Sequence, residues 1–136
     1  MAGLQKSTPT PESLTLHGQS RQLEISFSSG ERFLIPFELM RIYSPSAEVR
    51  GHGQGQEVLQ TGKRGVDIVG MEPVGNYAVQ PRFSDGHGSG LYTWDYLHFL
   101  GSQQSKLWAE YETKLQAAHT ERDAPMPEAA GQGCAH

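Results

Sequence analysis

The chain has 136 residues and a mass of 15.0 kDa, which is enough for one hydrophobic core but too short for two ordinary ones. Hydrophobic residues make up 36% of the sequence and charged residues 19%, a balance that excludes a chain disordered throughout. The net charge is −4 and the only adjacent basic pair is Lys63 and Arg64, so we expect no nucleic-acid partner, because such proteins usually carry a basic stripe.

Cysteine usage and the lack of long apolar runs indicate the cellular setting. Cys134 is the single cysteine, which rules out a disulfide within the chain and favours a reducing compartment. The N-terminal residues lack the apolar run of a signal peptide, and no apolar stretch approaches the roughly 20 residues of a membrane span. We therefore expect a cytoplasmic protein that does not bind a membrane.

The first predicted elements are strands. Residues 1–12 are polar and contain two prolines, and we predict that they form a flexible leader. Over residues 13–35, apolar and polar residues alternate between two turn signals, which is typical of strands with one buried face. The alternation is clearest in the second strand, with Leu23, Ile25 and Phe27. The pattern predicts a three-stranded antiparallel meander.

A short helix is predicted to follow the meander. Pro36 suits the first turn of a helix, where its missing N–H costs nothing. The helix must end before Pro45, because proline restricts the residue ahead of it. Residues 44–65 are rich in glycine and polar residues, so we predict a long loop there.

A second group of strands is predicted after the loop. The first of them covers residues 66–73 and the next covers residues 77–83. Pro81 lies inside the latter and has no N–H for the ladder, so we predict an edge strand or a bulge at that position. The glycine-rich turn 84–90 then leads into a short return strand, 91–93, which completes a hairpin.

Two helices are predicted in the last third of the chain. The first covers residues 94–100 and ends at Gly101, which we interpret as an αL stop. The segment 102–122 forms the second, helical from residue 105, with an apolar stripe of Trp108, Tyr111, Leu115 and Ala118. Residues 123–136 are predicted to be a disordered tail. The elements together predict an α+β fold with small antiparallel sheets, a meander plus a hairpin, and two or three helices.

No motif in the sequence predicts catalysis. There is no Gly-x-Ser-x-Gly nucleophile elbow and no Gly-x-x-x-x-Gly-Lys-Ser/Thr phosphate loop. Cys134 lies too near the chain end to sit in a shaped pocket as a nucleophile. Cys134 and His136 are spaced closely enough to chelate a metal, but a predicted tail lacks the fixed geometry of a zinc site. We therefore expect a protein that is not an enzyme.

One segment, residues 72–97, combines a strand, a glycine-rich turn, a second strand and an aromatic helix start. It contains Val-Gly-Asn-Tyr-Ala at 74–78, Asp-Gly-His at 85–87 and Tyr-Thr-Trp at 92–94. In these motifs the chain resembles the gamma-butyrobetaine-hydroxylase-like N-terminal domain family, and in particular its stand-alone bacterial members. The resemblance extends over about residues 13–101.

The resemblance implies a structural zinc site, and this chain departs from the family at that site. Family members bind the zinc through three cysteines and a histidine from the Asp-Gly-His region. The corresponding positions here are Ser44, Ser46, Val49 and His87, so the three thiolates are missing and His87 is the lone remnant. A single imidazole cannot hold a structural zinc, and we expect no metal cofactor at this position.

We interpret the chain as a small non-catalytic domain, an interaction or accessory module for a protein partner that the sequence does not identify. The candidate surface lies on the hairpin, where hydrogen-bonding groups are next to aromatic ones, at Asn76, Asp85, His87, Tyr92 and Trp94. In the alternative interpretation, these residues only stabilise the hairpin.

A metal-binding function is the competing hypothesis. The resemblance implies it, because similar domains occur fused to carriers of iron–sulfur clusters and ahead of 2-oxoglutarate oxygenase domains. Iron or zinc would then be held by His87, His52 and the tail residues Cys134 and His136. The chain would serve iron–sulfur cluster assembly or a separately encoded oxygenase.

Overall fold

The alternating apolar residues form the predicted meander. In the computed structural model, which describes residues 10–46 and 58–125, the first three strands are antiparallel and lie in the order β1-β2-β3. Their bounds are Pro11–His17 for β1, Gln22–Phe27 for β2 and Arg32–Pro36 for β3. β1 begins inside the predicted leader, since Pro11 already pairs with Phe27.

One face of the meander is buried and the other is solvated. Leu23, Ile25 and Phe27 of β2 are at most 1% exposed. In β3, Ile35 lies opposite Leu23 and Phe33 lies opposite Ile25. Because side chains alternate between the two faces of a strand, this register places all five on the core side of the sheet.

Helix α1, Phe37–Ile42, follows β3 directly and is buried along its whole length. Pro36 is the last residue of β3 and the N-cap of the helix, with ψ of 140°, rather than part of the first turn as predicted. Its extended backbone places it opposite Gln22, so the strand runs up to the helix without a loop. The helix ends before Pro45, as predicted.

The second sheet also has three antiparallel strands, in the order β4-β5-β6. Their bounds are Ile68–Val74 for β4, Ala78–Phe83 for β5 and Tyr92–Thr93 for β6. β5 is the central strand and the register shift of its pairing with β4 lies at Ile68/Gly70, so Pro81 marks neither of the two predicted features, an edge strand or a bulge at its own position. Pro81 is tolerated because the two-residue β6 pairs only with Ala78 and Val79 and ends before it reaches Pro81.

Helix α3, Trp94–Ser102, begins where predicted and continues past the predicted stop. The Thr93 hydroxyl caps it by accepting a hydrogen bond from the Tyr96 N–H at 3.3 Å. Gly101 lies inside the helix, so the predicted αL stop was wrong. A Cβ added to Gly101 would lie 2.6 Å from Cγ of Phe33, so the glycine is needed for the close approach of α3 to β3.

Helix α4, Gln104–Ala117, is shorter than the predicted helix 105–122. The core-facing side chains on it are Leu107, Tyr111 and Leu115. Of the predicted stripe, Tyr111 and Leu115 are buried, Trp108 is half-buried and Ala118 is exposed. The stripe therefore begins one residue earlier than predicted and stops where the helix ends.

After α4 the chain turns back onto the body of the protein. The Arg122 carbonyl accepts a hydrogen bond from the Gly62 N–H at 2.8 Å, and the Arg64 guanidinium binds Asp123 at 2.8 Å. Residues 123–125, the first of the predicted tail, are thus part of the folded structure. The rest of that predicted tail lies outside the described residues.

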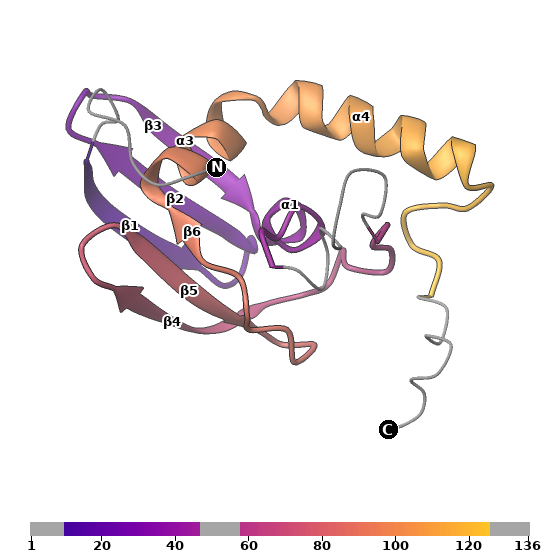
Figure 1. Ribbon diagram of the computed structural model, residues 1–136, viewed down its shortest axis with the longest axis horizontal. Helices are drawn as coiled ribbons and strands as arrows, with labels where there is room; N and C mark the ends of the chain where they lie inside the picture. Colours follow the sequence, from indigo (N-terminus) through magenta and orange to yellow (C-terminus); the bar gives the residue numbers. More distant parts are fainter. Residues whose placement is uncertain (1–9, 47–57, 126–136) are drawn as a thin grey trace.

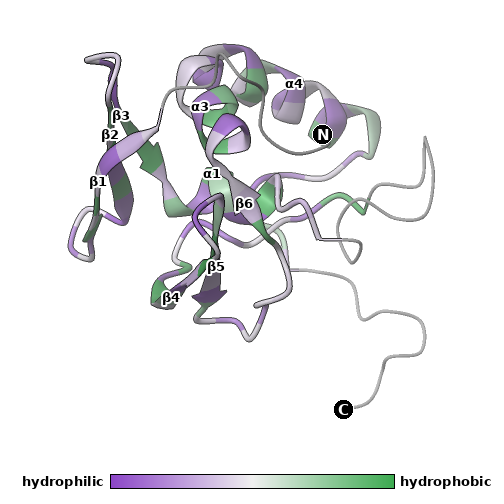
Figure 2. Ribbon diagram, turned by 60° about the vertical axis from the view of Figure 1, so that its left-hand side comes forward, coloured by the Kyte–Doolittle hydropathy of each residue, from purple (hydrophilic) through white to green (hydrophobic). Residues whose placement is uncertain are grey.

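The core lies between the two sheets and the helices, with α1 beneath α4 and next to the ends of β2 and β3 (Figure 1). Figure 2 shows hydrophobic residues on β2, β3 and α1, whereas α4 alternates between hydrophobic and hydrophilic residues. This is the predicted α+β fold, with two small antiparallel sheets and, in the described residues, three helices. None of these three combines the length and the apolarity needed to cross a membrane.

Candidate functional site

The structure corrects the surface predicted on the hairpin. Tyr92 is completely buried, and its hydroxyl donates to the Met40 carbonyl at 2.5 Å. His87 is buried as well. Neither side chain is available to a partner, because each faces the interior between α1 and the second sheet.

The other predicted surface residues hold the hairpin in place. The indole N–H of Trp94 donates to the Asn76 carbonyl at 2.8 Å, which ties the start of α3 to the turn between β4 and β5. Asp85 binds two cations, as described next. The alternative interpretation, that these residues stabilise the hairpin, therefore accounts for their contacts.

Asp85 joins the hairpin to α1 and to the segment before β4. Its Oδ2 accepts hydrogen bonds from Lys63 Nζ at 2.8 Å and from Arg41 Nε at 3.0 Å. Burial raises the pKa of Asp85, but the Lys63 hydrogen bond and the positive charges of Arg41 and Lys63 outweigh it, so the pKa lies below its usual value.

The lowered pKa gives a pH-dependent contribution to stability. A carboxyl group whose pKa is lower in the folded chain stabilises the fold above its unfolded pKa, about 3.9 for Asp. We expect the difference in unfolding free energy between the wild type and Asp85→Asn to be largest at neutral pH and to shrink as the pH falls below about 4. Urea denaturation of both proteins from pH 7 to pH 3 measures this, and a difference that is constant over the range would contradict it.

Three of the four positions that correspond to the family's zinc ligands, Ser44, Ser46 and His87, lie together in the structure. Ser44 Oγ and His87 Nε2 are hydrogen-bonded at 2.8 Å, and the Ser46 N–H donates to Ser44 Oγ at 3.2 Å. The hydroxyls of Ser46 and Ser89 are 2.6 Å apart. The segment after α1 is thereby joined to the glycine-rich turn by side-chain hydrogen bonds.

This group of side chains does not fit a structural zinc. It offers one imidazole and three neutral hydroxyls, whereas zinc sites use thiolates, imidazoles and carboxylates. Within residues 10–46 and 58–125, no group of three or more His, Cys, Asp or Glu side chains could hold a metal ion. The other predicted ligands, His52, Cys134 and His136, lie outside the described residues, as does Val49.

The Ser44–His87 pair has the spacing of a nucleophile and its base, but it is built differently from a catalytic pair. Ser44 is only 1% exposed, and its hydroxyl already accepts the Ser46 N–H while it bonds His87. A nucleophile must face the substrate with its attacking oxygen. The contacts of this pair are those of a structural link.

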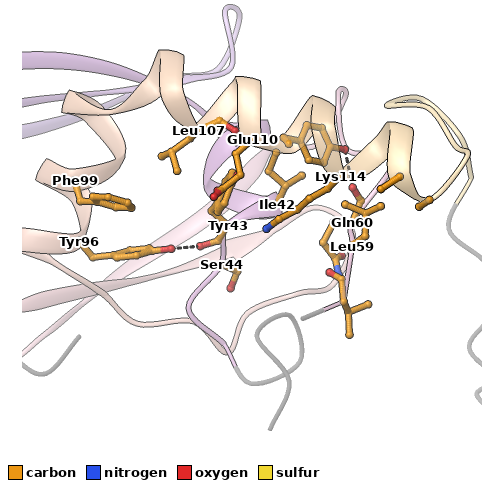
Figure 3. Close-up of a pocket in the computed structure, with 14 residues that line it drawn as sticks. Ile42, Tyr43, Ser44, Leu59, Gln60, Tyr96, Phe99, Leu107, Glu110 and Lys114 are labelled. Carbon is orange, nitrogen blue, oxygen red and sulfur yellow. Dashed lines mark hydrogen bonds between the residues drawn. The ribbon is translucent and has the colours of Figure 1, made fainter. Parts of the chain in front are cut away.

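A pocket of about 540 Å³ lies between α3, α4, residues 58–60 and the end of α1 with the following Tyr43 and Ser44 (Figure 3). Its size is that of a typical ligand pocket. Most of its walls are apolar or aromatic, formed by Ile42, Leu59, Tyr96, Phe99, Leu107 and Tyr111. The sequence did not predict this pocket, because its walls come from four separate segments. The apolar stripe predicted on α4 was the one feature of the sequence that pointed to a wall of it.

Three tyrosine hydroxyls at the pocket are bonded within the protein. Tyr43 donates to the Leu107 carbonyl at 3.0 Å or to Glu110 at 2.9 Å. Tyr96 donates to the Tyr43 carbonyl at 2.5 Å, and Tyr111 donates to a carbonyl in the segment before β4 at 2.6 Å. Burial raises the pKa of Tyr43, and it raises that of Tyr111 to about 12, so both phenols stay protonated at neutral pH.

The fold was compared with those of known proteins. Residues 14–98 match a family model described as gamma-butyrobetaine hydroxylase-like, N-terminal. A solution NMR structure of a protein 46% identical to the chain covers 98% of it and 100% of the other chain, with a TM-score of 0.76. A second NMR structure is 40% identical, covers 93% of this chain and 99% of the other, and has a TM-score of 0.74.

A crystal structure from Acidithiobacillus ferrooxidans is also similar. It shows a protein of unknown function that belongs to the DUF971 family and is 36% identical to this chain. The alignment covers 67% of this chain and 91% of the other, with a TM-score of 0.57. A comparison with curated proteins gave no match.

Proposed function

Since the chain belongs to the gamma-butyrobetaine hydroxylase-like N-terminal family, we propose that it is a non-catalytic interaction module of the cytoplasm, which binds a protein partner. The partner inserts an apolar side chain into the pocket between α3 and α4. The chain itself performs no reaction; it holds the partner in place.

The pocket is the observation that carries this proposal. It is lined by aromatic and aliphatic side chains, and large apolar residues at it remain exposed, with Phe99 at 39% and Val58 at 45%. Burying such residues against a partner removes apolar surface from water, which is the main favourable term in protein association. Pockets that receive one bulky side chain are also where the binding energy of an interface concentrates.

The hydrogen bonds of the side chains that could take part in chemistry support the same proposal. His87 and Asp85 do not line the pocket, and Ser44, which does, is 1% exposed and hydrogen-bonded to His87. Burial raises the pKa of Tyr43 and Tyr111, and the hydroxyls of Tyr43, Tyr96 and Tyr111 all donate to protein acceptors. A module that only binds needs the walls of the pocket and not a general acid, a base or a nucleophile.

Two matched variants test the proposal. Ala118 lines the pocket, whereas Ala109 is an exposed residue of α4 that does not. We expect tagged wild-type protein and Ala109→Trp to capture the same partner from a cell lysate, and Ala118→Trp to capture at least about tenfold less of it, because the indole occupies the pocket. Circular dichroism confirms that the variants are folded.

The same experiment separates the interaction module from metal handling. Capture is repeated in the presence of a chelator, and the metal content of the untagged protein is measured by elemental analysis. Equal capture by Ala118→Trp and wild type would rule out the pocket as the docking site. Capture that is lost with the chelator, together with stoichiometric iron or zinc that disappears in His87→Ala, would favour the metal-binding hypothesis instead.

A further inference from the structure

The polar groups at the pocket are nearly all bonded inside the protein. The hydroxyls of Tyr43, Tyr96 and Tyr111 donate to protein oxygens, and the Gln60 amide donates to the Val58 carbonyl at 3.0 Å. A ligand can gain a hydrogen bond from any of these groups only by breaking an internal one. They therefore shape the pocket and contribute little to its choice of a polar ligand.

Lys114 differs from these groups. Its ammonium lies 5.7 Å from the centre of the Tyr43 ring, and Figure 3 shows its side chain reaching from α4 across the pocket towards Tyr43. No ion pair of Lys114 is present in the described part of the chain. An ammonium group has three N–H donors, and its contact with the ring face leaves them able to bind an anion.

Glu110, one helical turn before Lys114, contacts the same tyrosine at a different point. Its carboxylate accepts the hydrogen bond of the Tyr43 hydroxyl at 2.9 Å, so it lies at the hydroxyl end of the ring while Lys114 lies over the ring face. An anionic group would be attracted to Lys114 and repelled by Glu110, so the charge pattern favours a carboxylate at the ring face.

From the apolar walls and from Lys114, the one cationic side chain among the described residues that line the pocket, we infer that the partner presents an acidic residue next to its apolar anchor, and that Lys114 binds this carboxylate. The inference rests on the proposed docking function and names the chemistry of the docked segment. It concerns a peptide segment of a protein, in which a bulky apolar side chain enters the pocket and an Asp or Glu lies within two positions of it.

Selection from a random heptapeptide library displayed on phage tests the inference. The baits are the wild type, Lys114→Glu and Lys106→Glu, the last being an exposed lysine of α4 that does not line the pocket. We expect the wild type and Lys106→Glu to enrich peptides with Asp or Glu beside a bulky apolar residue. Lys114→Glu should lose the acidic preference and select Lys or Arg in its place, because the sign of the charge is reversed.

The best wild-type peptide is then titrated by calorimetry with its Asp→Asn or Glu→Gln analogue. We expect the analogue to bind wild-type protein about three- to tenfold more weakly and to show no such difference with Lys114→Glu. Apolar peptides without an acidic preference, or an acidic preference unchanged in Lys114→Glu, would overturn the inference but leave the docking function standing. No enrichment of apolar peptides by the wild type would refute the docking of a peptide and the inference with it.

Discussion

Replacing Arg122 with alanine is expected to lower the free energy of unfolding by about 3 kcal/mol. Arg122 forms a bidentate pair with Glu38, whose side chain on α1 is only 5% exposed, with Nε at 2.7 Å from Oε2. Without the guanidinium, the buried carboxylate has lost its counter-charge and must be protonated or hydrated. The variant also loses the contact of Arg122 with the Trp108 ring, at 4.8 Å. Urea denaturation at neutral pH gives the value.

Arg64→Ala is the matched control for this prediction. Arg64 also forms a bidentate pair, with Asp123, but the two side chains are 57% and 56% exposed. Pairs of exposed charges are screened by water, so we expect Arg64→Ala to lose far less stability than Arg122→Ala. If the two variants were equally destabilised, burial of Glu38 would not be the reason for the large effect of Arg122.

Gly101→Ala is expected to destabilise the protein by about 1–3 kcal/mol, although alanine favours a helix over glycine by about 1 kcal/mol. The added Cβ would lie 2.6 Å from Cγ and 2.8 Å from Cβ of Phe33. These atoms are close to the backbone of β3, so Phe33 cannot swing away and α3 must move off the sheet. Thermal and urea denaturation measure the effect.

Two further variants test the cause. Gly18→Ala adds a Cβ that meets nothing within 4 Å, and we expect it to change the unfolding free energy by less than about 0.5 kcal/mol. In a background of Phe33→Ala, the cost of Gly101→Ala should become smaller, because the clashing ring is gone. A cost that is the same in both backgrounds would exclude the Phe33 ring as the source, since Phe33→Ala removes Cγ and Cδ2 but keeps Cβ.

The elements that the sequence predicted well are those determined by neighbouring residues. The alternation around Leu23, Ile25 and Phe27 predicts β2 of the meander, because a single polar residue separates each pair of buried side chains. The exact ends were harder to predict. Gly101 has the residue type of a helix stop, yet a contact with a strand almost seventy positions earlier keeps it inside α3.

The candidate site was harder still to predict, because it depends on contacts between residues that are far apart in the sequence. Nothing in the local pattern around Tyr43 or Phe99 indicates that they meet α4 at one pocket, because that depends on how three helices pack. The link between Ser44 and His87 could be foreseen only by the resemblance to a family that places zinc ligands there. Arg122, 84 residues after Glu38, lay in a segment predicted to be the end of a helix.

The two sheets have the same simple connectivity. Each is built from strands that follow one another in sequence, so short loops close them at little entropic cost. In the described residues no strand of one sheet pairs with a strand of the other, and the polar ties between the halves, Ser44 to His87 and Arg41 to Asp85, span more than forty residues. The meander and the second sheet are therefore held together by a shared hydrophobic core and by side-chain contacts, and not by a continuous ladder of backbone hydrogen bonds.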